Sequence, residues 1–438
     1  MKKSIAFFIA LMLIVVTVFA SACEIVAPSD NLPSADEGVI NSADEGDAPV
    51  VTDKTVDLMR GIVSADIQSV DVGEEFTTAY NDFAAQLFKS LYEGNNELIS
   101  PLSIEIALAM VANGAAGETK TQMEKVLFDG INVERFNKIL SSYVGSIQGQ
   151  DGVSIKVANS IWIKDDPYFS VKQAFLQTNA DYYAAQAYKA PFNDETLADV
   201  NGWVNDKTDG MINKILDDIS KDAVMYLINA VLFDAEWSVA FDEEYDYKFT
   251  CSDKAVKDVT LMLDEVSGYV SDDVAEGFIK SYKGSRFGFA ALLPKENKTV
   301  SEVVAAMTGK TLTDYFKSRV DEKVVLKMPK FKLDFKADLN DCLKALGMPD
   351  AFDKYLADFS ALGEYRDSSL YIDFVKHKTA IEVGEVGTKA AAVTAVGVKE
   401  TSVGPMTKTH YITLDRPFLY FIVDTKTNTP LFMGAYEK

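Results

Sequence analysis

The order of periodic segments along the chain restricts the possible folds most. Apolar residues recur at helical spacing from Tyr80 to Leu91, and Ile104–Ala112 is apolar on nearly every face. Runs rich in β-branched residues come mostly later, and the clearest is Val224–Phe233. Because strands and helices do not alternate regularly, the pattern disfavours a doubly wound parallel sheet. The sequence predicts an α+β fold in one large domain from about residue 74 to the end.

Composition narrows the function. The chain has 43 basic and 66 acidic side chains, a net charge of −23, which argues against a nucleic-acid partner. Three Cys exclude a disulfide-dense scaffold, and two His make a His-rich metal site unexpected. The sequence contains no HExxH, CxxC, Walker, GxGxxG or GxSxG motif. We therefore expect no cofactor, no metal and no enzymatic activity.

The first residues resemble an export signal. Lys2 and Lys3 precede the apolar run Ile5–Ala20, which is shorter than the roughly 20 residues that span a bilayer. The small residues before Cys23 resemble a bacterial lipobox, in which the Cys becomes the lipidated first residue of the mature protein. We expect a signal peptide at 1–22 and a protein anchored by lipid at the bacterial surface or envelope. Plain secretion is the alternative.

The segment after Cys23 has the composition of a tether. Residues 24–73 carry eleven acidic and two basic side chains, and the motif Ser-Ala-Asp-Glu-Gly occurs in it twice. Like charges repel and extend such a chain. We expect residues 23–73 to form a lipidated, acidic, disordered tether and residues 74–438 to form the folded domain.

A run of small and β-branched residues, Thr388–Val398, stands out near the C-terminus. Alternate positions place Thr388, Ala390, Ala392, Thr394 and Val396 on one uncharged face, while Lys389 lies on the other. Such a segment can slide between two strands of an existing sheet. An Ala-rich helix and a slack exposed loop are the alternatives, and the β-branched residues weaken the helix.

Several motifs together resemble the serpin family. The segment Gly387–Ala392, preceded by Glu385, resembles the serpin hinge. Further stretches resemble serpin motifs in the right order over about residues 75–438: Ser100–Ile104, Asn113–Thr119, Ala158–Trp162, Asn201–Val204, Leu227–Phe233, Met328–Phe331, Asp415–Leu419 and Pro430–Gly434. The resemblance implies three β-sheets, eight or nine helices and an exposed reactive-centre loop.

The resemblance also implies an activity. A target protease cleaves the reactive loop as a substrate, and the hinge then inserts into the large sheet as a new strand and distorts the acyl-enzyme. This describes an irreversible suicide-substrate inhibitor of serine proteases, with cysteine proteases as a second target class. The alternative is a non-inhibitory serpin that acts as a surface binding or carrier module.

Site residues follow from the family's motifs. The hinge comprises Glu385, Gly387, Thr388, Ala390, Ala391, Ala392 and Thr394. The breach, where insertion begins, contains Trp237 and Lys330, and the shutter, where central strands part, contains Ser100, Ser103, Asn229 and His377. The plainer readings are a helix cap at Ser100, a core histidine, and an ordinary Glu385–Lys330 surface ion pair worth about 0–1 kcal/mol.

The scissile bond follows from the usual hinge length. Counting from Gly387 places it at Thr401–Ser402, while Lys399, Glu400 and Met406 are alternatives in other registers. A small, uncharged Thr suggests an elastase- or subtilisin-like target. A monomer is expected.

Overall fold

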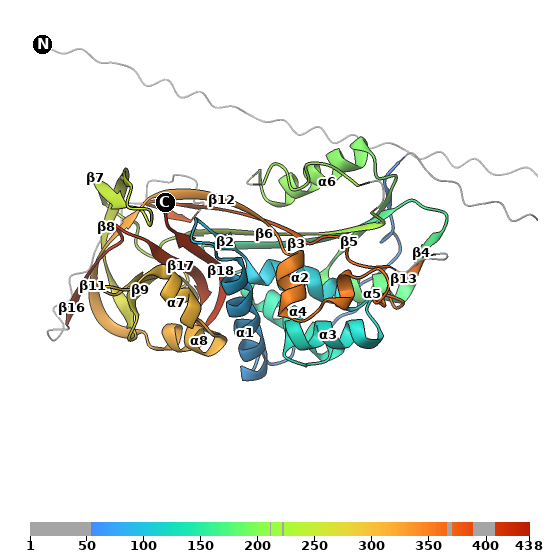
Figure 1. The fold of residues 1–438 in the computed structure, drawn as a ribbon, viewed down its shortest axis with the longest axis horizontal. Coiled ribbons are helices and arrows are strands. Elements are labelled where there is room, and N and C mark those ends of the chain that lie inside the picture. The colour runs from blue at the N-terminus through green and yellow to red at the C-terminus, as the bar shows by residue number, and fades with distance from the viewer. Residues whose placement is uncertain (1–53, 211, 221–222, 366–369, 389–407) are drawn as a thin grey trace, which may run out of the picture. The chain divides into compact units, whose positions relative to one another are not determined.

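The computed structural model describes residues 54–210, 212–220, 223–365, 370–388 and 408–438. These residues form three sheets and nine α-helices, which confirms the α+β fold (Figure 1). The helices are α1 (Glu74–Leu91), α2 (Pro101–Ala112), α3 (Gly117–Phe128), α4 (Val133–Ile147), α5 (Gln173–Tyr183), α6 (Asp194–Lys207), α7 (Val300–Ala306), α8 (Gly309–Lys317) and α9 (Asn340–Leu346). None of the helices in the described ranges is long and apolar enough to cross a membrane.

The large sheet has seven strands. In spatial order they are β1 (Val56–Asp57), β5 (Gln186–Ala190), β3 (Val153–Lys164), β6 (Met225–Glu236), β15 (Gly387–Thr388), β14 (Lys376–Val383) and β12 (Phe331–Asp338). The predicted central strand is confirmed as β6, which pairs with β3 from Met225 to Ala235. The two-residue strand β15 lies between β6 and β14 and is antiparallel to both.

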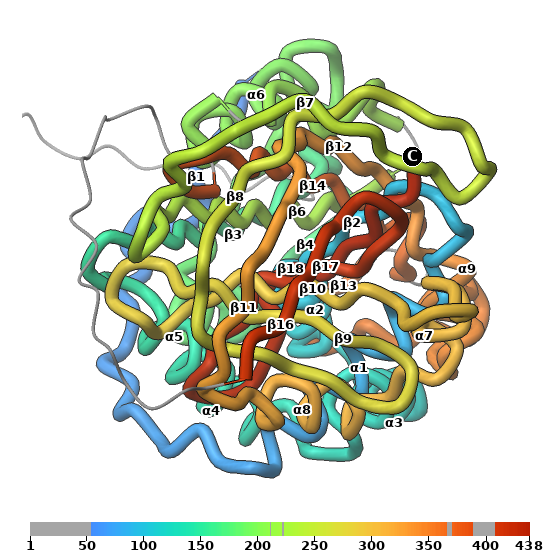
Figure 2. The backbone as a smooth tube through the Cα atoms, turned by 90° about the vertical axis from the view of Figure 1, so that its left-hand side faces the viewer, coloured from blue at the N-terminus to red at the C-terminus, as the bar shows by residue number. Residues whose placement is uncertain are grey.

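The second sheet has nine strands. Eight follow the order β16 (Thr409–Thr413), β11 (Val320–Pro329), β8 (Val256–Ser271), β9 (Ala275–Ser281), β10 (Phe287–Pro294), β17 (Phe418–Asp424), β18 (Thr429–Tyr436) and β2 (Leu98–Ile99), and β7 (Glu243–Thr250) pairs with β8. Figure 2 views the end of the molecule at which β7, β8, β11 and β16 lie. Within the described residues, the third sheet pairs β4 (Phe169–Val171) with β13 (Gly363–Tyr365).

Helices cover both faces of β6. Tyr226 and Ile228 join the apolar cluster that contains Val200 and Val204 of α6. The alternate residue Asn229 points to the opposite face, where its side chain contacts Ser103 of α2. Because neighbouring residues of a strand face opposite sides, β6 packs against α6 on one face and α2 on the other. Any strand inserted next to β6 must therefore fit against both helices.

The start of α2 is as predicted. Ser100 is the N-cap, its hydroxyl accepts a hydrogen bond from Ser103 N at 3.3 Å, and Pro101 occupies the first turn. All but one of the helix's residues are buried, because the helix lies between the large sheet and the other helices (Figure 1).

The segment before α1 contacts the domain. Val56 and Asp57 of β1 pair with β5, Ala65 N donates to Asp181 at 2.7 Å, and Val70 N donates to Ser142 Oγ at 2.9 Å. The sequence carried no signal for these contacts, because they are made mostly by the backbone of residues 56–70.

Candidate functional site

The beginning of the hinge is part of the large sheet. Thr388 is opposite Ala235 of β6 and Val383 of β14, and its side chain is buried, with 1% of the residue exposed. Gly387 lies so close to β6 that a Cβ would stand 2.1 Å from the Ala235 carbonyl oxygen, so only glycine fits there. The other predicted hinge residues, Ala390, Ala391, Ala392 and Thr394, and the predicted bond Thr401–Ser402 lie outside the described residues.

Trp237 holds the chain that leads into the hinge. Its indole Nε1 donates to the Gly384 carbonyl at 2.9 Å, and its backbone N donates to the Val386 carbonyl at the same distance. Phe241 N donates to the Glu385 carbonyl, also at 2.9 Å. Residues 237–241, which connect β6 to β7, therefore bind three successive residues ahead of Gly387.

Tyr282 contacts both Trp237 and Thr388, and the sequence analysis did not select it. Its ring stacks on Trp237 with centroids 4.4 Å apart and an interplanar angle of 13°. Its hydroxyl lies 2.5 Å from Thr388 Oγ1. Burial raises the pKa of Tyr282, so the neutral hydroxyl is the form present at physiological pH.

Lys330 and Glu385 lie together at the breach. Lys330 Nζ is 3.0 Å from Glu385 Oε2 and 2.6 Å from Glu244 Oε1, so two carboxylates share one ammonium. Partial burial alone would lower the pKa of Lys330, but hydrogen bonds to Glu244 and Glu385 outweigh it and raise the pKa overall. A backbone hydrogen bond and the Lys330 ammonium lower the pKa of Glu385. Because both side chains are partly exposed, water weakens this attraction.

The four predicted shutter residues form one hydrogen-bonded cluster, in which Ser100, Ser103 and His377 are buried and Asn229 is half-buried. Ser100 N donates to His377 Nε2 at 3.1 Å, and Ser103 Oγ donates to Asn229 Oδ1. Asn229 Nδ2 continues to Asn159 Oδ1 of β3 at 2.6 Å, a member that sequence reasoning did not select. The cluster connects α2 to β6 and β14, the strands on either side of β15, and reaches β3 through Asn159.

His377 is a neutral imidazole. Its Nε2 accepts a hydrogen bond, so Nδ1 carries the proton. Burial lowers the pKa of His377 from 6.5 to about 3, because a charged ring would be desolvated here. The shutter cluster is thus uncharged at neutral pH.

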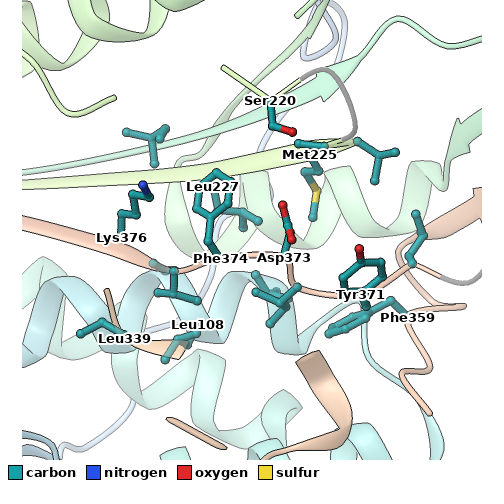
Figure 3. A pocket seen from close by; sticks show the side chains of 18 of the residues that line it. Leu108, Ser220, Met225, Leu227, Leu339, Phe359, Tyr371, Asp373, Phe374 and Lys376 are labelled. Carbon is teal, nitrogen blue, oxygen red and sulfur yellow. The ribbon is translucent and has the colours of Figure 1, made fainter. Parts of the chain in front are cut away.

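Below β15 the two central strands are separated by a cavity. Its volume is about 1000 Å³, and its walls come from residues 225–229 of β6, residues 370–378 leading into β14, and the face of α2 that carries Ser103 and Leu108. Figure 3 shows Met225 and Leu227 above this space, Phe374 on the chain beneath them with its ring reaching up beside Leu227, and Leu108 below. The ring centroid of Phe374 lies 4.9 Å from that of Tyr226 in β6. The cavity begins at the shutter residues Asn229 and His377 and extends away from the breach.

No metal centre is found in the described part of the chain, which has no cluster of three or more His, Cys, Asp or Glu suited to a metal. Cys251 and Cys342 are buried free thiols.

Comparison with known proteins gives a consistent answer. The profile of the family described as Serpin (serine protease inhibitor) matches residues 78–438. An uncharacterized serpin-like protein of Thermococcus kodakarensis is 31% identical over 368 residues, covering 81% of this chain and 84% of its own. The native-state crystal structure of the thermophilic serpin tengpin is similar with a TM-score of 0.83 and 40% identity, covering 88% of this chain and 100% of its own. Its latent-state structure gives a lower TM-score of 0.76 at 40% identity, covering 85% and 100% of the two chains.

Proposed function

We propose, because the chain belongs to the serpin family, that it is an irreversible suicide-substrate inhibitor of serine proteases. The family's description as serine protease inhibitors supports inhibition in general. The specific mechanism rests on one observation of this chain: Gly387–Thr388 already forms a strand between β6 and β14. The hinge thus has a defined entry into the sheet.

The existing register says where the rest of the hinge would lie. Thr388 is opposite Ala235 on β6 and Val383 on β14. Continuing both antiparallel ladders without a bulge brings Thr394 opposite Asn229 and His377 together. The register with β6 and the register with β14 would thus both bring Thr394 to the level of the shutter residues. Residues 395–398 would then continue alongside the cavity between the strands.

The faces match as well. Thr388 points into the core, so Ala390, Ala392 and Thr394 would point the same way, towards α2. The first two are small enough for a packed interior, and Thr394 would bring a hydroxyl to the half-buried Asn229 amide and the buried His377 imidazole. Buried polar groups need hydrogen-bond partners. The polar hinge residue Thr394 would therefore lie beside the polar residues Asn229 and His377 of the sheet.

Insertion would supply the driving force for trapping. A strand between β6 and β14 gains backbone hydrogen bonds on both edges and removes the separation between them. The protease serine attacks the Thr401 carbonyl and forms an ester, while the Ser402 amine leaves with the C-terminal part. The ester-linked protease then moves with the hinge as it enters the sheet, before water can release it.

Target and location complete the proposal. Thr401 at the scissile bond favours an elastase- or subtilisin-like protease. The signal sequence and Cys23 support export and lipid anchoring at a bacterial surface. The acidic segment that follows Cys23 would connect the anchor to the domain, and from Val56 onwards the chain already packs on the domain.

A protease panel tests the function directly. The purified chain is mixed with subtilisin, elastase, trypsin and papain, and the products are resolved on denaturing gels. A covalent band at the summed mass with subtilisin or elastase supports inhibition. Cleavage by every protease without any such band would contradict it and favour the binding or carrier alternative.

A further inference from the structure

A buried ion pair lies beneath the breach. Nζ of Lys280 in β9 and Oδ2 of Asp264 in β8 are 2.5 Å apart, and the two side chains are 2% and 1% exposed. Buried pairs contribute little net stability, since apolar side chains of similar volume often replace them without loss. A net gain in stability therefore does not by itself account for this pair.

The Lys280 ammonium contacts the segment between β6 and β7 at three residues. It donates a hydrogen bond to the Val239 carbonyl at 2.7 Å. It also lies over the ring of Phe241, 4.5 Å from the centroid, and over the ring of Trp237 at 5.5 Å. A cation over an aromatic face is attracted to it, most strongly where water is excluded. The same ammonium is also paired with the Asp264 carboxylate.

The same segment binds the approach to the hinge. Trp237 N and Phe241 N, on either side of Val239, donate to the carbonyls of Val386 and Glu385. Lys280 therefore acts on the hinge through one intervening layer of residues. Tyr282, two residues further along the chain, bonds the hydroxyl of Thr388 directly. Lys280 thus contacts residues 237–241, while Tyr282, on the same side of the chain, contacts Thr388.

We propose that Lys280 and Asp264 are positioning residues for hinge insertion. The pair keeps residues 237–241 in the conformation that binds 384–386, so that the chain enters the sheet at Thr388 in the correct register. Its effect on trapping rests on the proposed function, whereas its effect on the breach does not.

The test uses a double variant, Lys280→Met/Asp264→Leu, which removes both charges together and leaves neither one buried alone. Hydrogen exchange of the Trp237 and Phe241 amides is followed by mass spectrometry. We expect at least tenfold faster exchange at these two amides and unchanged exchange in β17 and β18.

A second ion pair provides the matched control. Lys189 Nζ and Asp165 Oδ1 are also 2.5 Å apart, and the carboxylate is buried. Lys189 lies in β5 and Asp165 follows β3, near the other edge of the large sheet. Lys189→Met/Asp165→Leu should leave exchange at Trp237 and Phe241 unchanged. Equal acceleration by both double variants would show general loosening of the fold and overturn the proposal, as would unchanged exchange in Lys280→Met/Asp264→Leu.

A second variant covers the case in which the double variant does not fold. Phe241→Leu keeps both charges but removes the ring beneath the ammonium. It should accelerate exchange at Phe241 and Trp237 by a smaller factor, and no acceleration in this variant would overturn the proposal.

The kinetic consequence is measured with the protease that wild-type protein traps. We expect Lys280→Met/Asp264→Leu to raise the number of inhibitor molecules consumed per trapped protease at least threefold, with an unchanged rate of first encounter. An unchanged number would overturn the positioning role. If wild-type protein traps no protease, the proposed function fails, and the exchange experiment still decides the role of the pair.

Discussion

Thr388 Oγ1 and the Tyr282 hydroxyl lie 2.5 Å apart in the core, although the two residues are 106 positions apart in the chain. The first residue of the predicted hinge that enters the sheet is therefore already anchored in the intact protein. Tyr282 also stacks on Trp237, which binds the chain just ahead of the hinge. These contacts make position 388 the most informative site for substitution.

Thr388→Arg should convert the inhibitor into a substrate. An unpaired guanidinium at this buried position costs several kcal/mol, so it should displace the first hinge residue from its place between β6 and β14. Without that entry, insertion should be slower than hydrolysis of the acyl-enzyme. Denaturing gels should show loop cleavage without a covalent complex. The control is Thr409→Arg, at an exposed position in β16, which should still form complexes. Undiminished complex formation by Thr388→Arg would mean that residue 388 does not need to be inside the sheet.

Cleavage of the loop should stabilise the protein. A new central strand adds hydrogen bonds to β6 and β14 and fills the cavity between them, whereas a cut in an ordinary loop only increases the entropy of the unfolded chain. The melting temperature should rise by tens of degrees, against the few degrees that about 1 kcal/mol would give. Mass spectrometry of the released peptide locates the bond. Equal melting temperatures argue against insertion, while a cut at Lys399, Glu400 or Met406 changes only the register.

His377 should make the domain sensitive to mild acid. Burial lowers the folded-state pKa to about 3 from the unfolded value of 6.5, so the stabilising effect is complete above pH 6.5 and is lost as the pH falls towards 3. Between pH 6.5 and about pH 5, the free energy of unfolding should fall by about 2 kcal/mol. His377→Gln keeps an acceptor for Ser100 N but does not titrate, so this slope should disappear.

The protein with His377 and the His377→Gln variant are both measured by denaturant unfolding, each carrying His410→Gln as well. The chain has only two histidines, so this background leaves His377 as the one histidine that differs. A slope that persists in His377→Gln would assign the acid sensitivity to other groups.

Glu105 of α2 should limit stability at neutral pH. Both of its carboxylate oxygens are buried without a hydrogen-bond partner, and burial raises its pKa well above the ordinary value of 4.5. Because the folded protein favours the neutral acid at Glu105, the loss of stability from this residue is absent below pH 4.5 and grows as the pH rises above it. Glu105→Gln should therefore raise the free energy of unfolding at pH 7 but not at pH 4. Glu93→Gln, at an exposed position, is the control and should change neither value.

Cys23→Ala should release the protein from membranes if Cys23 is the lipidated N-terminus. In a bacterial host, the wild-type chain should fractionate with membranes and label with radioactive palmitate, and the variant should do neither. A variant that remains in the membrane fraction with its signal uncleaved would contradict lipidation.

Local sequence was sufficient for much of the fold. Helical spacing predicted α1, the Ser-Pro pair marked the start of α2, and the β-branched run predicted β6. These signals are local, because a cap or a periodic face is set by neighbouring residues. Contacts made by backbone groups, such as those of residues 56–70 with β5, α4 and α5, leave no comparable trace.

The sequence by itself determined the family, the helical and strand segments, and the small uncharged face of the hinge, because these properties are written in residue types and their spacing. Only the tertiary structure decided which residues meet. Tyr282, Lys280 and Asp264 carry no local signal, since their roles come from contacts between strands distant in the chain. That Asn229 of β6 and His377 of β14 lie at the same level of the sheet likewise depends on β6 and β14 flanking β15, a pairing that long-range packing alone can set.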